Sequence, residues 1–224
     1  MSRVGVLAVQ GAFVEHERVL EDLGAECFEI RKAADLDRVP DALVIPGGES
    51  TVMGKLIRDL GMIGRLRDMV LDGTPVLGTC AGMILLARDV EGGERHLATM
   101  PIGVRRNAYG RQLGSFSTRA DFAGLGEIPL EFIRAPAVTS VGDGAEALSM
   151  LDGVPVAVRC GNQIATAFHP ELTGDPTVHR YFLGLVRSRA SFLVNSMDRN
   201  PIENCFTSLL ANRRQAFSYR FQGE

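Results

Sequence analysis

Cys80 and its neighbours have the pattern of a catalytic thiol. Cys80 lies in the segment Gly-Thr-Cys-Ala-Gly at 78–82, directly after the apolar residues 75–77 and before the helix-compatible residues 83–87. This order of strand, sharp turn and helix is the cysteine counterpart of the Gly-x-Ser-x-Gly nucleophile elbow. The two glycines remove side chains that would clash where the backbone reverses, so we expect the thiol to project with little covering it. A helix N-terminus also favours thiolate over thiol, while a buried core cysteine in front of a helix is the structural alternative.

His169 supplies the second group that thiol chemistry requires. It follows the strand-like residues 164–168, Pro170 fixes the turn after it, and Glu171 can accept a hydrogen bond from its imidazole. Amide hydrolysis through a thiol needs a base that keeps the sulfur ionised, a group that orients the base, and donors for the oxyanion. Cys80, His169 and Glu171 fit the roles of nucleophile, base and orienting group in a triad. A lone histidine at a strand end, by contrast, is more often packed in the core or on the surface.

The donors for the oxyanion are expected from the main chain. Gly47 and Gly48 follow a predicted strand and expose N–H groups that could meet the N–H of Ala81 across the nucleophile. On its own, a Gly-Gly pair after a strand would indicate only a turn. Together with the elbow, it predicts an oxyanion hole formed by Gly48 and Ala81.

The other histidines and cysteines indicate no further site. His16 and His179 fall in predicted helices and His96 in a charged loop, so we interpret all three as structural or solvated. The four cysteines share no metal-ligand spacing and predict neither a zinc site nor a disulfide framework: Cys27, Cys80, Cys160 and Cys205. A reducing cytoplasm fits this cysteine usage best.

Composition favours a single enzyme-sized domain. The chain has 224 residues, 46% of them apolar, and a net charge of −3, which suffices for one well-buried core. Nothing in this charge balance suggests a nucleic-acid partner. The N-terminus turns polar too quickly for a signal peptide, and no run reaches the roughly 18 apolar residues of a membrane helix.

The order of predicted elements indicates an α/β fold. Strands are expected at residues 3–9, 26–30, 42–45 and 76–77, and helices at 13–23, 52–60 and 63–71, with Ser50 as a helix cap. This alternation predicts a doubly wound parallel sheet with its chemistry beyond the carboxyl ends of the strands. Short β-prone pieces between 103 and 168 predict antiparallel ribbons. A last helix is expected at 177–189, with Val178, Phe182, Leu185 and Val186 buried.

Several motifs together resemble a known family. The elbow with His169-x-Glu171 is similar to the triad-type glutamine amidotransferases, and six segments resemble the glutaminase subunits of pyridoxal 5'-phosphate synthase. These are residues 5–13, 46–51 (Pro-Gly-Gly-Glu-Ser-Thr), 78–83, 106–112 (Arg-Asn-x-Tyr-Gly-Arg-Gln), 132–136 and 168–172. The match runs in order from residue 3 to about residue 188. It implies a three-layer, mostly parallel α/β sheet of the flavodoxin-like glutamine amidotransferase type.

The resemblance implies a role for each matching residue. Cys80 attacks the glutamine amide, His169 moves the proton and Glu171 orients His169. The glutamine site is lined by Gly48, Glu49, Ser50, Arg106, Ile133 and Arg134. Arginine for the α-carboxylate and glutamate for the α-ammonium of glutamine is sensible chemistry, although without the resemblance both arginines would be ordinary strand-end surface charges.

The resemblance also implies a partner. Family members hydrolyse L-glutamine to L-glutamate and ammonia for a separate synthase subunit, a barrel enzyme in a large hetero-oligomer. Their glutaminase is weak until docking, which a mobile peptide at Gly47–Gly48 would explain. Pyridoxal 5'-phosphate is the product of the pathway, so no cofactor and no metal are expected.

The resemblance stops near residue 190. We therefore expect an amidotransferase domain at 1–190 and a C-terminal tail at 191–224. Asn200, Pro201 and Glu203 have the order of a helix start, so the tail is expected to be either disordered or a short helix.

Three other functions stay open at this point. The chain could serve a different ammonia-using synthase, for example in histidine biosynthesis, although the segment at 47–51 argues against it. It could be an elbow-cysteine hydrolase or stress protein, although these do not need His-x-Glu after a late strand. It could also be a scaffold subunit without turnover, although every triad position is filled.

Overall fold

The structure is a computed structural model that describes residues 1–108 and 115–197, with side chains up to residue 191. The motif residues 109–112 and the helix start expected at Asn200 lie outside this part. The chain divides into two units, Met1–Val186 and Arg187–Glu224. The first unit contains every strand described below, and the described part of the second unit is helical from Arg187 to Met197.

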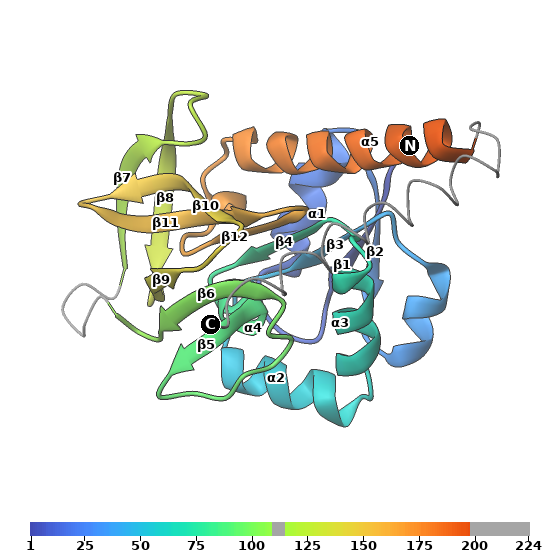
Figure 1. Cartoon of the computed structure of the whole chain (residues 1–224), viewed down its shortest axis with the longest axis horizontal. Coiled ribbons are helices and arrows are strands. Elements are labelled where there is room, and N and C mark those ends of the chain that lie inside the picture. The colour runs from blue at the N-terminus through green and yellow to red at the C-terminus, as the bar shows by residue number, and fades with distance from the viewer. Residues whose placement is uncertain (109–114, 198–224) are drawn as a thin grey trace, which may run out of the picture. The chain divides into compact units, whose positions relative to one another are not determined.

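A seven-stranded sheet forms the centre of the first unit (Figure 1). Five strands are parallel, and their spatial order is β2 (Glu26–Ile30), β1 (Arg3–Leu7), β3 (Ala42–Ile45), β4 (Val76–Thr79) and β12 (Gln163–Thr166). Two antiparallel strands, β11 (Val154–Cys160) and β10 (Ala145–Leu151), extend the sheet beyond β12. This order confirms the flavodoxin-like fold class, since the chain reverses its direction of travel across the sheet between β1 and β3.

Helices cover both faces of the sheet. Figure 1 shows α1 (Phe13–Asp22) and the first part of α5 (Thr177–Met197) on one side, and α2 (Ser50–Asp59) and α3 (Ile63–Leu71) on the other. A short helix, α4 (Ala81–Leu86), follows β4, and two 3₁₀ turns lie at η1 (Ala33–Arg38) and η2 (Pro170–Leu172). The expected three layers are therefore present.

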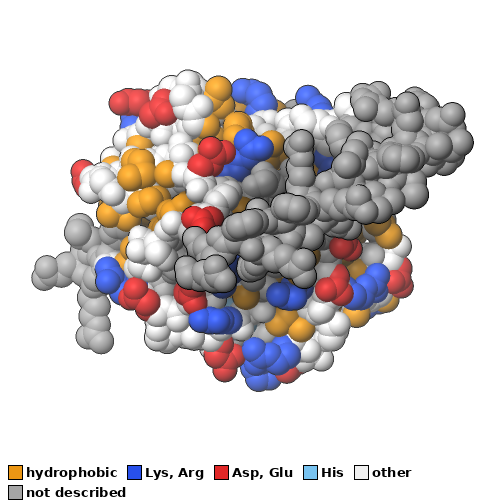
Figure 2. Space-filling view, viewed as in Figure 1, with side chains coloured by type: hydrophobic (Ala, Val, Ile, Leu, Met, Phe, Trp, Pro, Cys, Tyr) orange, Lys and Arg blue, Asp and Glu red, His pale blue; other side chains and the backbone are white. Residues whose placement is uncertain are grey.

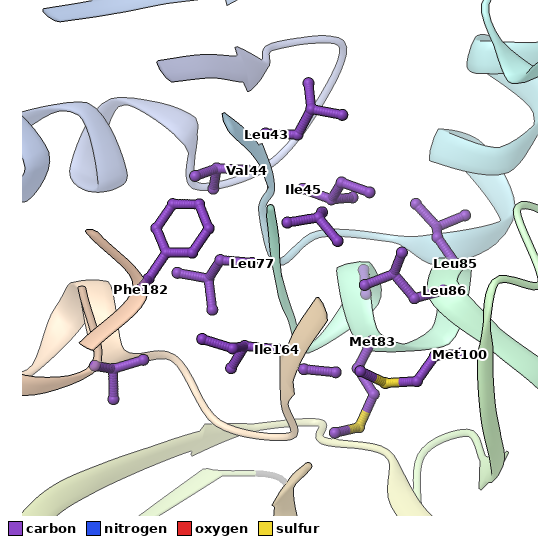
Figure 3. Packing of buried hydrophobic residues seen from close by; sticks show 14 of the residues in the cluster. Leu43, Val44, Ile45, Leu77, Met83, Leu85, Leu86, Met100, Ile164 and Phe182 are labelled. Atoms are coloured by element: carbon purple, nitrogen blue, oxygen red, sulfur yellow. The ribbon is translucent and has the colours of Figure 1, made fainter. Parts of the chain in front are cut away.

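The core lies on both faces of the parallel strands, as covered strands require. Figure 3 shows Phe182 of α5 beside Val44 and Leu77 on one side, and Leu86 of α4 near Ile45 on the other. All five side chains are fully or almost fully buried. Of the residues expected to be buried on α5, Leu185 is only partly buried, and Leu183 is buried instead.

Two smaller sheets project from this core. One consists of β5 (Ala87–Glu91), β6 (Met100–Arg105) and β9 (Ala137–Val141), and the other is the antiparallel pair β7 (Ser115–Asp121) and β8 (Glu127–Ile133). The expected antiparallel ribbons are present in β10–β11, β6–β9 and β7–β8. Two parallel pairings were not expected. Strand β12 pairs parallel with β4 inside the main sheet, and β5, which the sequence did not indicate, pairs parallel with β6.

Several element boundaries differ from the expected ones. The strand expected at 3–9 ends at Leu7, and the last helix continues beyond residue 189 to Met197. The expected cap Ser50 is wrong. Glu49 caps α2 instead, since its carboxylate accepts hydrogen bonds from the N–H groups of Thr51 at 3.2 Å and Val52 at 2.7 Å.

The surface carries charges of both signs. Figure 2 shows Lys and Arg side chains lying among Asp and Glu side chains over the face that it draws. Within the described ranges, no helix combines the length and apolar character needed to cross a membrane.

Candidate active site

The predicted site residues meet at the carboxyl edge of the main sheet. Gly47, Gly48 and Glu49 follow β3, Cys80 follows β4, and His169 follows β12 shortly after its end. Since β3, β4 and β12 are neighbours and parallel, their carboxyl ends place these distant segments side by side. The position is next to the β1/β3 switch point, where ligands bind in doubly wound sheets.

The expected strand–turn–helix is present at Cys80. Its backbone has φ 48° and ψ −98°, a strained conformation for a residue with a side chain. The flanking glycines make this turn possible, because a Cβ at Gly82 would lie 2.1 Å from the Ile45 carbonyl oxygen. The Cys80 N–H donates to the Thr166 carbonyl at 2.7 Å, which ties the turn to the end of β12.

The thiol is more covered than expected. Cys80 is only 6% exposed, and its sulfur lies 3.8 Å from the carbonyl oxygen of Ile133 at the end of β8. The β7–β8 pair therefore closes over the turn. Cys80 also lines the adjoining pocket.

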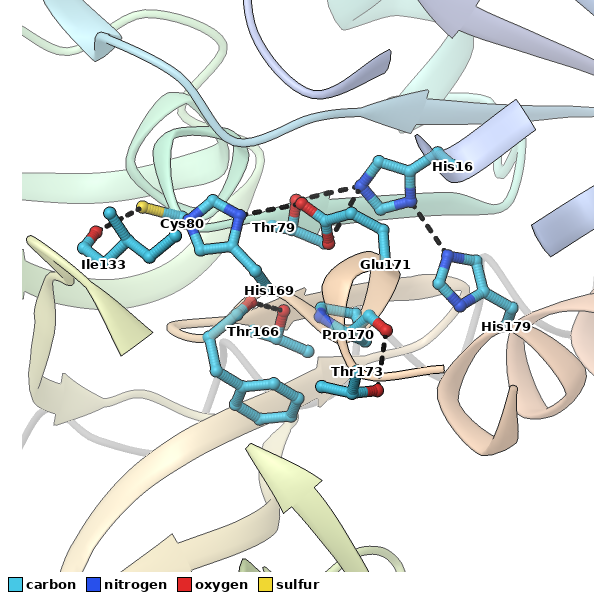
Figure 4. Close-up of polar contacts among 11 residues, drawn as sticks. His16, Thr79, Cys80, Ile133, Thr166, His169, Pro170, Glu171, Thr173 and His179 are labelled. Atoms are coloured by element: carbon cyan, nitrogen blue, oxygen red, sulfur yellow. Dashed lines mark hydrogen bonds and ion pairs between the residues drawn. The ribbon is translucent and has the colours of Figure 1, made fainter. Parts of the chain in front are cut away.

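His169 lies between Cys80 and Glu171 (Figure 4). Its Nδ1 lies 2.7 Å from the Glu171 carboxylate, and its backbone N–H donates to the Glu131 carbonyl at 2.8 Å. Burial alone would lower the pKa of His169. The hydrogen bonds with Cys80 and Glu171 more than offset burial and raise the pKa of His169 to about 10. The imidazole is therefore held in its charged form beside the sulfur.

Glu171 is a buried carboxylate that stays ionised. Burial alone would raise its pKa, but the neighbouring His16 and the hydrogen bond from His169 hold the pKa of Glu171 below its usual range. A buried anion of this kind can fix the imidazole tautomer and stabilise its positive charge, which is the third role in a triad.

A pocket of about 310 Å³ opens beside Cys80 and His169, within the size range of small-molecule sites. All six residues expected to bind glutamine line it: Gly48, Glu49, Ser50, Arg106, Ile133 and Arg134. Ala81, the other expected oxyanion donor, is not among the lining residues and lies buried at the start of α4.

Glu49 and Arg106 are paired with each other in this structure. Their side chains lie 2.8 Å apart at the pocket wall. Burial would raise the pKa of Glu49, but the N–H groups of Val52 and Thr51 and the charge of Arg106 lower it overall. The ionised pair presents one charge of each sign, which matches the two charges of an amino-acid backbone.

The Gly47–Gly48 peptide is held in one orientation. The Gly47 carbonyl accepts a hydrogen bond from the N–H of Ala12 at 3.0 Å, so in this trans peptide the Gly48 N–H points the opposite way. Gln10 supports the next peptide, since its side-chain oxygen accepts from the N–H of Glu49 at 2.8 Å. Gln10 also lines the pocket, and the sequence motifs did not single it out as a site residue.

Two histidines that we expected to be structural or solvated belong to the surroundings of the triad. His16 and His179 are completely buried, and His16 Nε2 lies 3.3 Å from the second carboxylate oxygen of Glu171. The sequence does contain a usable signal. Both residues lie in the first turns of helices, and those turns adjoin the carboxyl edge of the sheet in this fold.

No metal site is evident in the part of the chain that the structure describes. Cys27, Cys80 and Cys160 are free thiols. Burial, with the nearby Glu21 and Glu17, raises the pKa of Cys27 to about 12, so this thiol stays protonated.

Comparisons with known proteins agree with this geometry. Residues 6–188 match the SNO glutamine amidotransferase family. The chain is 58% identical over 184 residues to a pyridoxal 5'-phosphate synthase subunit PdxT of Methanocorpusculum labreanum, covering 82% of this chain and 97% of that protein. It is 52% identical over 191 residues to the PdxT subunit of Desulfitobacterium hafniense, covering 85% and 96%. A solved structure described as a glutamine amidotransferase superposes with a TM-score of 0.78 at 46% identity, covering 82% of this chain and 98% of that one.

Proposed function

This chain belongs to the SNO glutamine amidotransferase family, and from that premise we propose how its residues carry out the reaction. The chain is a glutaminase subunit that hydrolyses L-glutamine and supplies the ammonia for pyridoxal 5'-phosphate synthesis. One observation carries the proposed mechanism: the imidazole of His169 lies between the sulfur of Cys80 and the carboxylate of Glu171.

In the first half of the reaction, the Cys80 thiolate attacks the side-chain carbonyl carbon of glutamine and forms a C–S bond. The electron pair of the carbonyl moves onto oxygen and gives a tetrahedral oxyanion. His169, charged at neutral pH, donates its proton to the amide nitrogen as the C–N bond breaks. Ammonia leaves, and a γ-glutamyl thioester remains on Cys80.

In the second half, neutral His169 accepts a proton from water as the water oxygen attacks the thioester carbon. The C–S bond breaks, glutamate leaves and the thiolate–imidazolium pair is restored. Glu171 keeps the ring in one tautomer throughout and stabilises its charge. The N–H groups of Gly48 and Ala81 are the proposed donors to the oxyanion in both halves.

Substrate binding follows from the pocket chemistry. Arg106, with Arg134, is proposed to bind the α-carboxylate of glutamine, and Glu49 its α-ammonium group. Ser50, Ile133 and Gly48 complete the walls around the side-chain amide. The Glu49–Arg106 pair supports this assignment, since it places both signs of charge in the pocket before the substrate arrives.

The synthase subunit that receives the ammonia is proposed to be a barrel enzyme in a large hetero-oligomer with this chain. We further propose that residues 1–190 form the amidotransferase domain, that 191–224 lie outside it, and that the complex acts in the cytoplasm. Free thiols at Cys27, Cys80 and Cys160 are compatible with a reducing compartment.

The test is glutamate and ammonia release by the full chain mixed with the synthase subunit. We expect glutamine hydrolysis with the wild type, less without the synthase subunit, and none with Cys80→Ala. Cys160→Ala, which removes a free thiol from β11, serves as the control and is expected to keep its activity. Glutamate release by Cys80→Ala would overturn the proposed mechanism.

A further inference from the structure

Two buried imidazoles continue the line of the triad beyond Glu171 (Figure 4). Glu171 Oε1 faces His169 Nδ1 at 2.7 Å, and its other oxygen, Oε2, faces His16 Nε2 at 3.3 Å. His16 Nδ1 in turn lies 2.9 Å from His179 Nε2. The Thr79 hydroxyl, one residue before the nucleophile, lies 3.1 Å from His16 Nε2. Five side chains from four segments thus lie in one buried polar network.

One unpartnered atom shows which ring nitrogens of His179 and His16 carry the protons in this polar network. Among the described residues, His179 Nδ1 is buried and has no hydrogen-bond partner. A buried N–H without an acceptor is rare, so Nδ1 is the nitrogen without hydrogen and Nε2 carries it. His179 Nε2–H then donates to His16 Nδ1, which leaves the His16 proton on Nε2.

That proton donates to the Thr79 hydroxyl at 3.1 Å, and the carboxylate lies beside it. A carboxylate only accepts hydrogen bonds. Glu171 Oε2 has no hydrogen-bond partner among the described residues, and His16 Nε2 lies 3.3 Å from it, at ion-pair distance. The opposite tautomer of His16 would direct a nitrogen lone pair at the Oε2 anion and would repel it. We propose that His16 is a positioning residue for glutamine hydrolysis, whose Nε2–H, anchored on the Thr79 hydroxyl, stabilises the second oxygen of Glu171 electrostatically from 3.3 Å, and that His179 fixes the tautomer of His16. This inference rests on the proposed triad.

The electrostatic environment favours neutral imidazoles at His16 and His179. Burial lowers the pKa of His16 and lowers that of His179 to about 3. The groups that act on His16 are Glu171 and His169 from the segment after β12, Glu15 on its own helix, and His179 on α5. A neutral N–H at His16 stabilises the Glu171 carboxylate, while the negative charge of that carboxylate remains available to the charged ring of His169.

Two substitutions of His16 separate its two contacts. In His16→Gln the side-chain amide nitrogen can reach the position of Nε2, and in His16→Asn it can reach only the position of Nδ1. We expect the Gln variant to keep most of the activity with the synthase subunit. We expect the Asn variant to lose about 10- to 100-fold in kcat, with KM for glutamine unchanged and the alkaline limb of kcat/KM shifted to lower pH.

A control separates positioning from stability. Leu20→Val weakens the same helix at a fully buried position away from the triad, so it should lower Tm and leave the pH profile unmoved. Equal kcat and equal pH profiles for the Gln and Asn variants would overturn the inference.

A measurement on the unchanged protein does not depend on how the variants fold. Nitrogen-15 NMR of the histidine rings in the full chain should show His16 and His179 both neutral and protonated on Nε2 at pH 7.5. A charged His16, or a proton on its Nδ1, would overturn the inference while normal glutamine hydrolysis left the proposed function standing. Absence of hydrolysis by the wild-type complex would instead overturn the proposed function, and this inference with it.

Discussion

Gly47 lies directly against the imidazole of His169. A Cβ at position 47 would come within 2.2 Å of the ring carbon Cε1, closer than any real Cβ contact. The two residues follow β3 and β12, which flank β4 in the sheet, so the contact spans the end of β4, the strand that leads into Cys80. The ring can take its place between Cys80 and Glu171 only because position 47 has no side chain.

Gly47→Ala should therefore displace the catalytic imidazole. We expect kcat for glutamine hydrolysis to fall by about 100-fold, because a shift of about 1 Å in a catalytic group has that effect. Steady-state kinetics with the synthase subunit measures this loss. Gly64→Ala is the matched control, since a Cβ there meets nothing within 4 Å, and it should keep full activity. Equal activity of the two variants would contradict the account.

The Glu171→Gln substitution should change the pH dependence of catalysis. Hydrogen bonds with Cys80 and Glu171 raise the pKa of His169 to about 10 in spite of burial, and the variant loses the contribution of a carboxylate. We expect the alkaline limb of kcat/KM to move to lower pH, with a reduced maximum. Glu131→Gln is the control, because Glu131 accepts from His169 through its backbone carbonyl while its carboxylate accepts from the Ser117 hydroxyl. An unmoved limb in Glu171→Gln would contradict the assigned role.

The same pKa has a consequence for stability. Because folding raises the pKa of His169 above that of the unfolded chain, its stabilising contribution is complete below about pH 6.5 and is lost as pH rises through about 10. The unfolding free energy of the wild type should therefore decrease over that pH interval, and the unfolding free energy of Glu171→Gln should decrease less. Urea unfolding at a series of alkaline pH values measures both slopes.

Arg106→Met should weaken substrate binding more than chemistry. Arg106 is partly buried, pairs with Glu49 and lines the pocket, so its loss removes the proposed partner of the α-carboxylate. We expect KM for glutamine to rise by about tenfold or more, with a smaller change in kcat. Arg105→Met removes the exposed neighbouring charge and should leave KM unchanged. A fall in kcat with no change in KM would contradict the binding role.

His179 should make the fold sensitive to acid. Burial lowers its pKa to about 3, so below about pH 6.5 the unfolded chain takes up a proton that the folded chain does not. The unfolding free energy should then decrease as the pH is lowered, by up to about 1.4 kcal/mol per pH unit for this proton. His179→Gln should flatten the dependence between pH 6.5 and 4, and His96→Gln, at a less buried ring, should flatten it less. Unchanged slopes in His179→Gln would contradict the burial of a neutral ring.

Local patterns predicted the elements that local interactions determine. Strands at 26–30 and 42–45 and the helix at 63–71 have the expected bounds, because each is an apolar or amphipathic run between clear stop signals. Glu49 replaced Ser50 as the cap of α2 because Gln10 and Arg106, from distant segments, hold Glu49 in place. Strand β5 was missed because only its pairing with β6 makes the polar residues after Leu86 extended.

In the site, too, the residues with local motifs could be predicted and those placed by tertiary packing could not. Cys80, His169 and Glu171 could be predicted because each carries a local motif and adjacent parallel strands bring their ends together. His16 was missed because it carries no local motif: beyond its place in the first turn of a helix, its contacts with both Glu171 and His179 depend on how α1 and α5 pack. The covered state of Cys80 likewise depends on β8, which joins the site through tertiary packing alone.

The most direct test of Cys80 as the nucleophile is to identify the residue that a reactive glutamine analogue labels covalently. The full chain with its synthase subunit would be treated with a glutamine analogue that carries a chloromethyl ketone in place of the side-chain amide, and digested for peptide mass spectrometry. We expect one label per chain on Cys80, slowed by His169→Ala, and none on Cys27, whose pKa near 12 keeps it protonated. A label on another residue, or an unlabelled Cys80 in a complex that still hydrolyses glutamine, would contradict the account.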